Sequence, residues 1–185
     1  MPRAGLSADR VVAEAEALAD EVGLDQLSLA ALAARLGVQP PSLYKHIAGQ
    51  DALQRTLGAR AKAELADVMR DAAVGRSGPD AVRALAQAYR RWAIAHPGRY
   101  TATLAAPDPS DAEAVAESIR AVDVLRGALA SYELTGDVEI DAIRSLRSAL
   151  HGFVALEAAG GFGLPLDVDR SYARLVEMLL ATFER

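Results

Sequence analysis

The sequence predicts an all-α fold, with an N-terminal three-helix domain that contains a helix-turn-helix and a C-terminal helical domain. Three observations support this fold class. Alanine and other strong helix formers dominate, while aromatic residues make up only 5% of the 185 residues and long β-branched runs are absent. Apolar residues recur at the three- and four-residue spacing of amphipathic helices. Glycines, prolines and capping residues divide the chain into about nine helical segments.

The first four helices are predicted from their end signals. Ser7 and Ser28 are suited to cap two helices, because a serine hydroxyl accepts a hydrogen bond from an amide of the first turn. Gly23 and Gly37 are suited to end the same two helices. The proline pair that follows fits only the first turn of the third helix. We expect these helices at residues 8–22, 29–36, 40–46 and 50–73.

Five further helices follow a linker-like turn at residues 75–79. Pro97 ends one helix at His96 and begins the next, because the residue before a proline disfavours helical geometry. The stretch from Ser110 to Glu113 has the spacing of a capping box. We expect these helices at residues 79–95, 97–105, 111–132, 138–159 and 168–184.

The composition excludes several classes of protein. The chain contains no cysteine, so disulfides and cysteine-based zinc sites are excluded. No apolar stretch is long enough to span a membrane. Acidic residues interrupt the N-terminal segment, which is unlike a signal peptide. We therefore expect a soluble cytoplasmic protein.

The sequence shows no catalytic or metal-binding pattern. The three histidines, His46, His96 and His151, lack the HxxxH spacing of a zinc site. The GGFG stretch at residues 160–163 follows a predicted helix and not a strand, so it is not a dinucleotide fingerprint. Neither a nucleophile elbow nor a phosphate-binding GKS or GKT occurs. We therefore predict no enzyme activity, no cofactor and no metal site.

Residues 27–53 carry the pattern that indicates a function. A short helix, a turn with Gly37 and a second short helix form a helix-turn-helix, whose second helix fits the DNA major groove. The net charge of −5 argues against nucleic acid, but residues 26–50 contain no acid, only Arg35, Lys45 and His46 as basic groups. The residues predicted to form the core of the motif are Leu29, Leu32, Ala33, Leu36, Val38 and Leu43.

This segment resembles the DNA-binding domain of the TetR family of bacterial repressors. The stretch GVQPPSLYKHIAGQDAL at residues 37–53 matches that family's turn, recognition helix and start of the next helix. AYRRWAIAHPGRY at 88–100 and ALHGFVALEAAG at 149–160 resemble the C-terminal domain type with a Trp-His-Gly motif, although Leu150 replaces the tryptophan. The resemblance implies a DNA-binding domain at residues 1–49 and a ligand-binding and dimerisation domain at 50–185, connected by the helix at 50–73.

The resemblance also implies a set of DNA-binding residues. Those similar to base-facing positions are Gln39, Pro40, Pro41, Ser42 and Lys45. Those similar to positions that hold phosphates, or that lie at a helix N-terminus favouring an anion, are Tyr44, His46, Ser28 and Leu29. Gln50 belongs to the same surface and stands where the family commonly has lysine. With Arg3 and Arg35 as the only further cations nearby, we expect DNA binding to depend weakly on salt.

Each of these assignments has a structural alternative. Tyr44 would close the core of the small domain instead of contacting DNA. His46 would be an ordinary surface histidine, and Lys45 a solvated charge without a base contact.

A homodimer is expected because so short a recognition helix contacts few base pairs, and specific binding then needs two copies on a palindromic operator. Apolar stripes in the last two helices are wider than one core face requires, and they predict the dimer interface. These interface residues are Ile143, Leu146, Leu150, Phe153, Leu175, Val176, Leu179 and Phe183. The alternative is that they pack only within the monomer.

The resemblance further implies a cavity for an unknown small-molecule effector among the helices of residues 79–159. Aromatic side chains with a few convergent polar groups suit a small organic ligand. The candidate residues are Trp92, His96, Tyr100, Leu104, Val122, Arg126, His151 and Phe153. The alternative is that the aromatic residues belong to the core and that Arg126 is a surface charge.

Together these inferences predict a ligand-responsive transcriptional regulator, a repressor that a small molecule releases from a palindromic operator. The ligand is expected to move the helix at residues 50–73 and to separate the two recognition helices, through its different affinity for the two states. The alternative function is a dimeric helical sensor or interaction protein that does not bind DNA.

Overall fold

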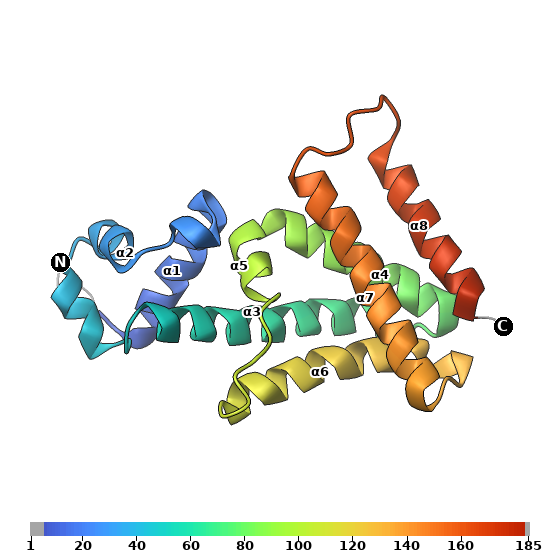
Figure 1. Cartoon of the computed structure of the whole chain (residues 1–185), viewed down its shortest axis with the longest axis horizontal. Helices are drawn as coiled ribbons and strands as arrows, with labels where there is room; N and C mark the ends of the chain where they lie inside the picture. The colour runs from blue at the N-terminus through green and yellow to red at the C-terminus, as the bar shows by residue number, and fades with distance from the viewer. Residues whose placement is uncertain (1–5, 184–185) are drawn as a thin grey trace. The chain divides into compact units, whose positions relative to one another are not determined.

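The computed structural model describes residues 6–183, and within that range every regular element is helical, as predicted (Figure 1). Arg3 lies outside the described residues. The α-helices are α1 (Ala8–Val22), α2 (Leu29–Leu36), α3 (Gln50–Ala73), α4 (Gly78–Ala95), α5 (Pro97–Ala102), α6 (Ala112–Leu129), α7 (Gly136–Ala158) and α8 (Val168–Phe183). Three short 3₁₀ segments complete the set: η1 (Leu24–Gln26), η2 (Pro40–Lys45) and η3 (Ala130–Tyr132). Among the described helices, none is both long and apolar enough to cross a membrane.

The chain divides into two compact units. The first contains the residues up to Lys62 together with His96–Ser118, and the second contains Ala63–Ala95 and the residues from Ile119 onward. Both α3 and α6 therefore contribute to both units. We predicted a division between residues 49 and 50, whereas the first unit keeps the start of α3 and also includes α5. The reason is that α5 packs against α1, a long-range contact that helix signals do not reveal.

Local capping explains the first two helices of the first unit. The Ser7 hydroxyl accepts a hydrogen bond from the Arg10 amide at 3.2 Å, and the Ser28 hydroxyl accepts one from the Ala31 amide at 3.2 Å. Gly37 ends α2 in the left-handed conformation (φ 68°), where its amide donates to the carbonyl oxygens of Ala33 and Ala34. These serine and glycine positions are the ones predicted.

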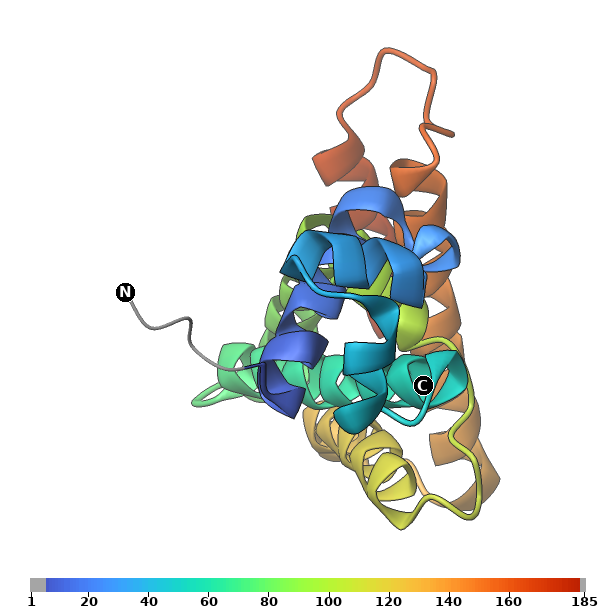
Figure 2. The same ribbon diagram turned by 90° about the vertical axis from the view of Figure 1, so that its left-hand side faces the viewer.

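The core of the first unit joins α1, α2, η2 and the start of α3. Val11, Leu32, Leu43 and Leu53 have no exposed surface, and they belong to one continuous apolar cluster. Both views place α5 beside the C-terminal part of α1 (Figures 1 and 2). Gly98 allows this approach, because a Cβ atom there would lie 2.0 Å from the Ala19 carbonyl oxygen.

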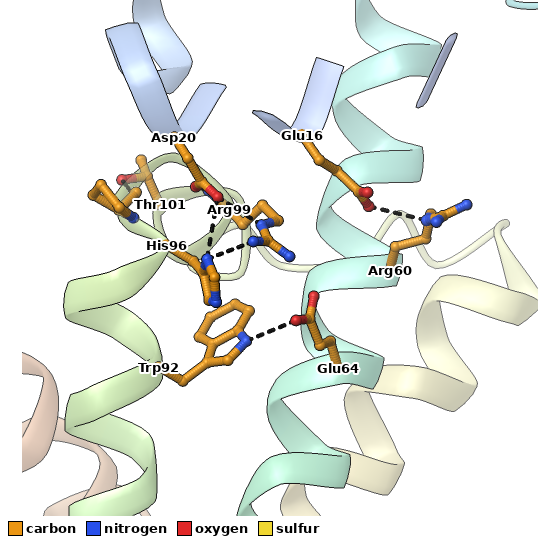
Figure 3. Close-up of polar contacts among 9 residues, drawn as sticks. Glu16, Asp20, Arg60, Glu64, Trp92, His96, Arg99 and Thr101 are labelled. Carbon is orange, nitrogen blue, oxygen red and sulfur yellow. Dashed lines mark hydrogen bonds and ion pairs between the residues drawn. The ribbon is translucent and has the colours of Figure 1, made fainter. Parts of the chain in front are cut away.

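A polar anchor reinforces the contact between α1 and α5. Asp20 accepts hydrogen bonds from the Arg99 backbone amide at 2.8 Å and from Arg99 Nε at 2.7 Å. Arg99 also donates to His96 Nδ1, which lies 3.4 Å from Asp20 Oδ2 (Figure 3). The start of α5 is thereby fixed to the end of α1.

The second unit is built on α4, α7 and α8. Leu85, Leu146, Leu150 and Tyr172 have no exposed surface and lie in its core. The Tyr172 hydroxyl donates to the Ala86 carbonyl oxygen at 2.6 Å, and burial raises the pKa of Tyr172 above its ordinary value. This hydrogen bond fixes α8 on α4.

A buried arginine fastens the connection between α7 and α8. Arg90, in α4, is 8% exposed and donates to both carboxylate oxygens of Glu157 at 2.6 and 2.7 Å. It also lies 2.8 Å from Asp169, in the first turn of α8. Its guanidinium carbon is 4.9 Å from the centre of the Tyr172 ring. Arg90 therefore holds both ends of the connection at residues 159–167.

The start of α6 differs from the prediction. We expected Ser110 to cap this helix, but Asp111 does so, and its Oδ1 accepts from the Ala114 amide at 3.0 Å. The Ser110 hydroxyl is instead engaged by Asp108 Oδ1 at 2.7 Å. The physical reason is that Asp108 competes with the helix for Ser110. Its Oδ1 atom accepts from both the amide and the hydroxyl of Ser110, and this local turn takes the hydroxyl away from the cap.

Candidate nucleic-acid interface

The helix-turn-helix is formed by α2, the turn at Gly37 and η2. The amide of Val38 bonds the Ala33 carbonyl at 3.0 Å and closes the turn. We expected a short helix at residues 40–46, and the structure has a six-residue 3₁₀ segment, Pro40–Lys45. Its two prolines have no backbone N–H to donate. Two hydrogen bonds of this segment link residues three apart, as in a 3₁₀ helix: the Ser42 amide donates to the Gln39 carbonyl, and the His46 amide to the Leu43 carbonyl.

The outward face of η2 carries the predicted DNA-binding residues. Leu43 is fully buried beneath it, whereas Gln39, Pro41, Tyr44 and Lys45 are exposed. The Tyr44 side chain is 61% exposed, so it does not close the core as the alternative interpretation required. The remaining members, Pro40, Ser42 and His46, are half-buried at the edge of the same face.

Two more predicted residues lie where α2 begins. Ser28 is exposed and Leu29 half-buried, and the hydroxyl of Ser28 is used in capping. Gln50, the first residue of α3, donates from Nε2 to the Leu27 carbonyl oxygen at 2.7 Å. This bond gives Gln50 a positioning role, because it fixes the start of α3 to the residue before the α2 cap.

The positive charge of this surface is smaller than the sequence suggested. Arg35 donates to both Glu21 oxygens at 2.6 and 2.8 Å and to Glu14 at 3.0 Å. These hydrogen bonds lower the pKa of Glu21 and commit Arg35 to α1. Lys45 is therefore the main cation that the acid-free segment presents, with the half-buried His46 beside it.

The predicted ligand-binding residues have varied surroundings. Trp92 is buried, and its Nε1 donates to Glu64 at 3.1 Å within the second unit (Figure 3). Phe153 packs against Phe162 and Tyr172, with ring centres 4.6 and 5.0 Å away. Arg126 is an exposed residue, paired with Asp123 and Glu139.

The other candidates divide between the two units. His96 takes part in the Asp20–Arg99 anchor of the first unit, where Tyr100 is buried and Leu104 is 40% exposed. Val122 and His151 are half-buried in the second unit. Their role in ligand binding stays a prediction.

Most of the predicted dimer residues belong to the core of their own unit. Ile143, Leu146, Leu150, Val176 and Phe183 are at most 8% exposed. This burial within one copy favours the alternative that these five side chains pack inside the monomer, and their place in a dimer interface stays a prediction. Phe153, Leu175 and Leu179 are half-buried. In α7 and in α8, the strongest apolar stripe packs into the interior of the unit. The sequence alone does not distinguish the stripe that faces the core from one that faces a second copy.

Several structurally important residues carry little local sequence signal. The contact between α1 and α5 depends on Asp20, Gly98 and Arg99. Asp20 and Arg99 are 79 residues apart in the sequence, and no local pattern predicts such a contact. Arg90 and Glu157 were likewise not singled out, although a charged residue on the core-facing side of α4 was a usable signal.

Comparison with known sequences gives matches over most of the chain. Residues 11–54 match the model described as "Bacterial regulatory proteins, tetR family", and residues 82–179 match "Tetracyclin repressor-like, C-terminal domain". The chain is 36% identical over 180 residues to the HTH-type transcriptional regulator YobS of Bacillus subtilis (strain 168), covering 97% of this chain and 94% of that protein. It is also 36% identical over 183 residues to the HTH-type transcriptional regulator Rv0681 of Mycobacterium tuberculosis (strain H37Rv), covering 98% and 84%.

Solved structures share the fold. The regulatory protein SCO4313 superposes with a TM-score of 0.75 at 28% identity, covering 94% of this chain and 97% of that one. A TetR variant from Acinetobacter baumannii AYE, in complex with minocycline, has a TM-score of 0.72 at 24% identity and covers 98% of both chains. At that identity the likeness concerns the fold alone. From its sequence matches and its fold, the chain belongs to the tetR family of bacterial regulatory proteins.

Proposed function

We propose that this chain is a ligand-responsive, DNA-binding transcriptional repressor of the cytoplasm. It binds a palindromic operator as a homodimer and leaves the operator when a small molecule binds. The observation that carries the proposal is the exposed, acid-free face of η2, with Gln39, Tyr44 and Lys45 outward over the buried Leu43. Amide, phenol and ammonium groups are suited to base edges and phosphates.

The surrounding geometry makes this face rigid. The Gly37 turn, the buried Leu43 and the Gln50–Leu27 hydrogen bond hold η2 between α2 and α3. A rigid backing places contact groups without a large ordering cost on binding. The exposed Ser28 end of α2 adds a helix N-terminus, which favours a phosphate nearby.

Selection of bound duplexes from a random library tests the proposal directly. We expect enrichment of a palindrome whose half-sites are about one helical turn apart or a multiple of it. A chain that enriches no sequence even in dilute salt would support the alternative of a helical sensor that does not bind DNA.

Replacing Tyr44 with alanine is expected to weaken operator binding by about tenfold or more, because a contact to the duplex is lost. The free energy of unfolding should change by less than about 0.5 kcal/mol, because the side chain is 61% exposed. Fluorescence anisotropy with the selected duplex and denaturant unfolding measure the two quantities.

The matched control is Val22→Ala, a truncation of another exposed apolar side chain of the first unit, 45% exposed on α1. It should leave both quantities unchanged. Equal DNA affinity of the Tyr44 variant and the wild type would remove Tyr44 from the interface.

The proposed dimer uses the outward faces of α7 and α8. Met178 is 61% exposed and Leu156 54%. Met178 and the half-buried Leu179 lie three and four residues after the half-buried Leu175, so all three share one side of α8. Gly152 borders open space, since an added Cβ would meet no atom of residues 6–183 within 4 Å, apart from its chain neighbours and the backbone of its own helix. A second pair of helices could therefore approach closely there.

Substitution of Met178 by glutamate is expected to convert the dimer into a monomer, because dimerisation would then bury a charge. The monomer itself should fold normally, since this side chain faces solvent. Light scattering at micromolar concentration should give a mass of two subunits for the wild type and of one subunit for the variant.

Val74→Glu, at a 68% exposed position directly after α3, is the control and should stay dimeric. A wild-type mass of one subunit would contradict the dimer, and a dimeric Met178 variant would exclude this face.

A further inference from the structure

The first unit contains a pocket of about 320 Å³ that no sequence pattern indicated. One wall is the face of α3 from Asp51 to Lys62, and the other is formed by α5 and the connection to α6, from Thr101 to Asp108. In Figure 1 this connection is the yellow-green coil that passes α3. None of the predicted ligand-binding residues lines this pocket.

Small side chains keep the pocket open. Gly58 and Ala59 on α3 face Ala102, Ala105 and Ala106, so no long side chain fills the space. A Cβ atom at Gly58 would lie 3.0 Å from the Ala102 carbonyl oxygen, so even alanine there would crowd the wall. The volume lies at the lower end of the range for small-molecule sites, about 300–1,000 Å³.

Two cations flank this small-residue wall. Arg55 and Lys62 are seven residues apart, and two helical turns place them on the same face of α3. Lys62 donates from Nζ to the Ala105 carbonyl oxygen at 2.7 Å and so joins the two walls. Arg55 makes no hydrogen bond or ion pair with any residue of the range 6–183, although a guanidinium has five donors.

Neither acid that lines the pocket, Asp51 or Asp108, forms a hydrogen bond or ion pair with Arg55. Asp108 accepts hydrogen bonds from the Ser110 amide at 2.9 Å and from its hydroxyl at 2.7 Å. These bonds, with a smaller effect of the Arg55 charge, lower the pKa of Asp108. Its Oδ1 atom is therefore engaged in a local turn. Asp51 lies one turn before Arg55, toward the start of α3 and away from Lys62.

We propose that this pocket binds a small organic carboxylate, with the apolar body against the alanine walls and the carboxylate on Arg55. The planar guanidinium fork matches a carboxylate with two parallel hydrogen bonds, which favours this anion over a neutral ligand of the same shape. The site differs from the expected effector cavity, because none of the residues predicted to line that cavity belongs to it, and it does not depend on DNA binding.

The test uses the full chain labelled with ¹⁵N and three probes with one aromatic ring, namely benzoate, benzamide and benzylamine. Benzoate should shift the amides of Gly58, Ala59 and Ala106 in a saturable manner, and it should bind more tightly than the other two. Arg55→Gln should weaken benzoate binding by about tenfold or more and leave benzamide binding unchanged. Ala59→Leu should abolish the binding of both benzoate and benzamide, because the larger side chain would fill the pocket.

The control is Arg91→Gln, at an exposed arginine of the second unit, which should bind benzoate like the wild type. Both arginine variants change exposed side chains, so their amide spectra should stay dispersed. The proposal is overturned if no saturable shift appears at the pocket amides, if benzamide or benzylamine binds as well as benzoate, or if the Arg55 and Arg91 variants behave alike.

Discussion

Replacing Arg90 with methionine is expected to lower the free energy of unfolding by about 3 kcal/mol. The substitution keeps most of the apolar stem but leaves the Glu157 carboxylate, whose side chain is 21% exposed, without its paired donor. Asp169 contributes little to this effect, since its side chain is 82% exposed and remains solvated. The contact between the guanidinium and the Tyr172 ring is also lost. Chemical denaturation followed by circular dichroism measures the change.

Arg91 provides the matched control, because it is the next residue of α4 and is exposed. Arg91→Met should change stability by less than about 0.5 kcal/mol. The double variant Arg90→Met, Glu157→Leu should recover much of the loss, since both members of the pair are then apolar. If the single Arg90 variant were as stable as the wild type, the pair would not fasten α7 and α8 to α4.

Gly98→Ala is expected to destabilise the first unit by about 2–3 kcal/mol, the upper part of the range for overpacked sites. A Cβ atom at this position would lie 2.0 Å from the oxygen and 2.1 Å from the carbon of the Ala19 carbonyl. Both neighbours are backbone atoms, so α5 must move away from α1. This shift would also lengthen the hydrogen bonds between Asp20 and Arg99. Amide hydrogen exchange should show lost protection in α5 and at the end of α1.

The corresponding change at Gly127 separates crowding from helix propensity. Gly127 is exposed within α6, and among the described residues an added Cβ there would meet no atom within 4 Å beyond its chain neighbours and its own helix backbone. Gly127→Ala should therefore raise stability by up to about 1 kcal/mol. A Gly98 variant that gained stability as the Gly127 variant does would show that α5 does not need this close approach.

The helices were predictable because the chemistry that ends them is local. Ser7, Ser28 and Gly37 act on amides and carbonyls within a few residues, so their roles follow from the sequence itself. The division into units was not predictable in the same way. It depends on the approach of Gly98 to Ala19, which brings together residues far apart in the chain.

The outward face of η2 could be predicted for a related reason. Leu43 is the apolar residue that the small core requires, and its burial leaves Tyr44 and Lys45 outward. The partners of Arg35 could not be predicted, because Glu14 and Glu21 lie 21 and 14 residues away. The faces of α7 and α8 were also ambiguous, since both helices carry apolar residues on more than one side.

The commitment of Arg35 to α1 has a consequence for how the proposed regulator searches a chromosome. Non-specific attraction to a duplex comes from displaced counterions, and a protein with few free cations displaces few of them. Random sequence would therefore retain little of the protein. Discrimination would rest on the groove edges of the correct site, and fewer molecules would be held up elsewhere in the genome.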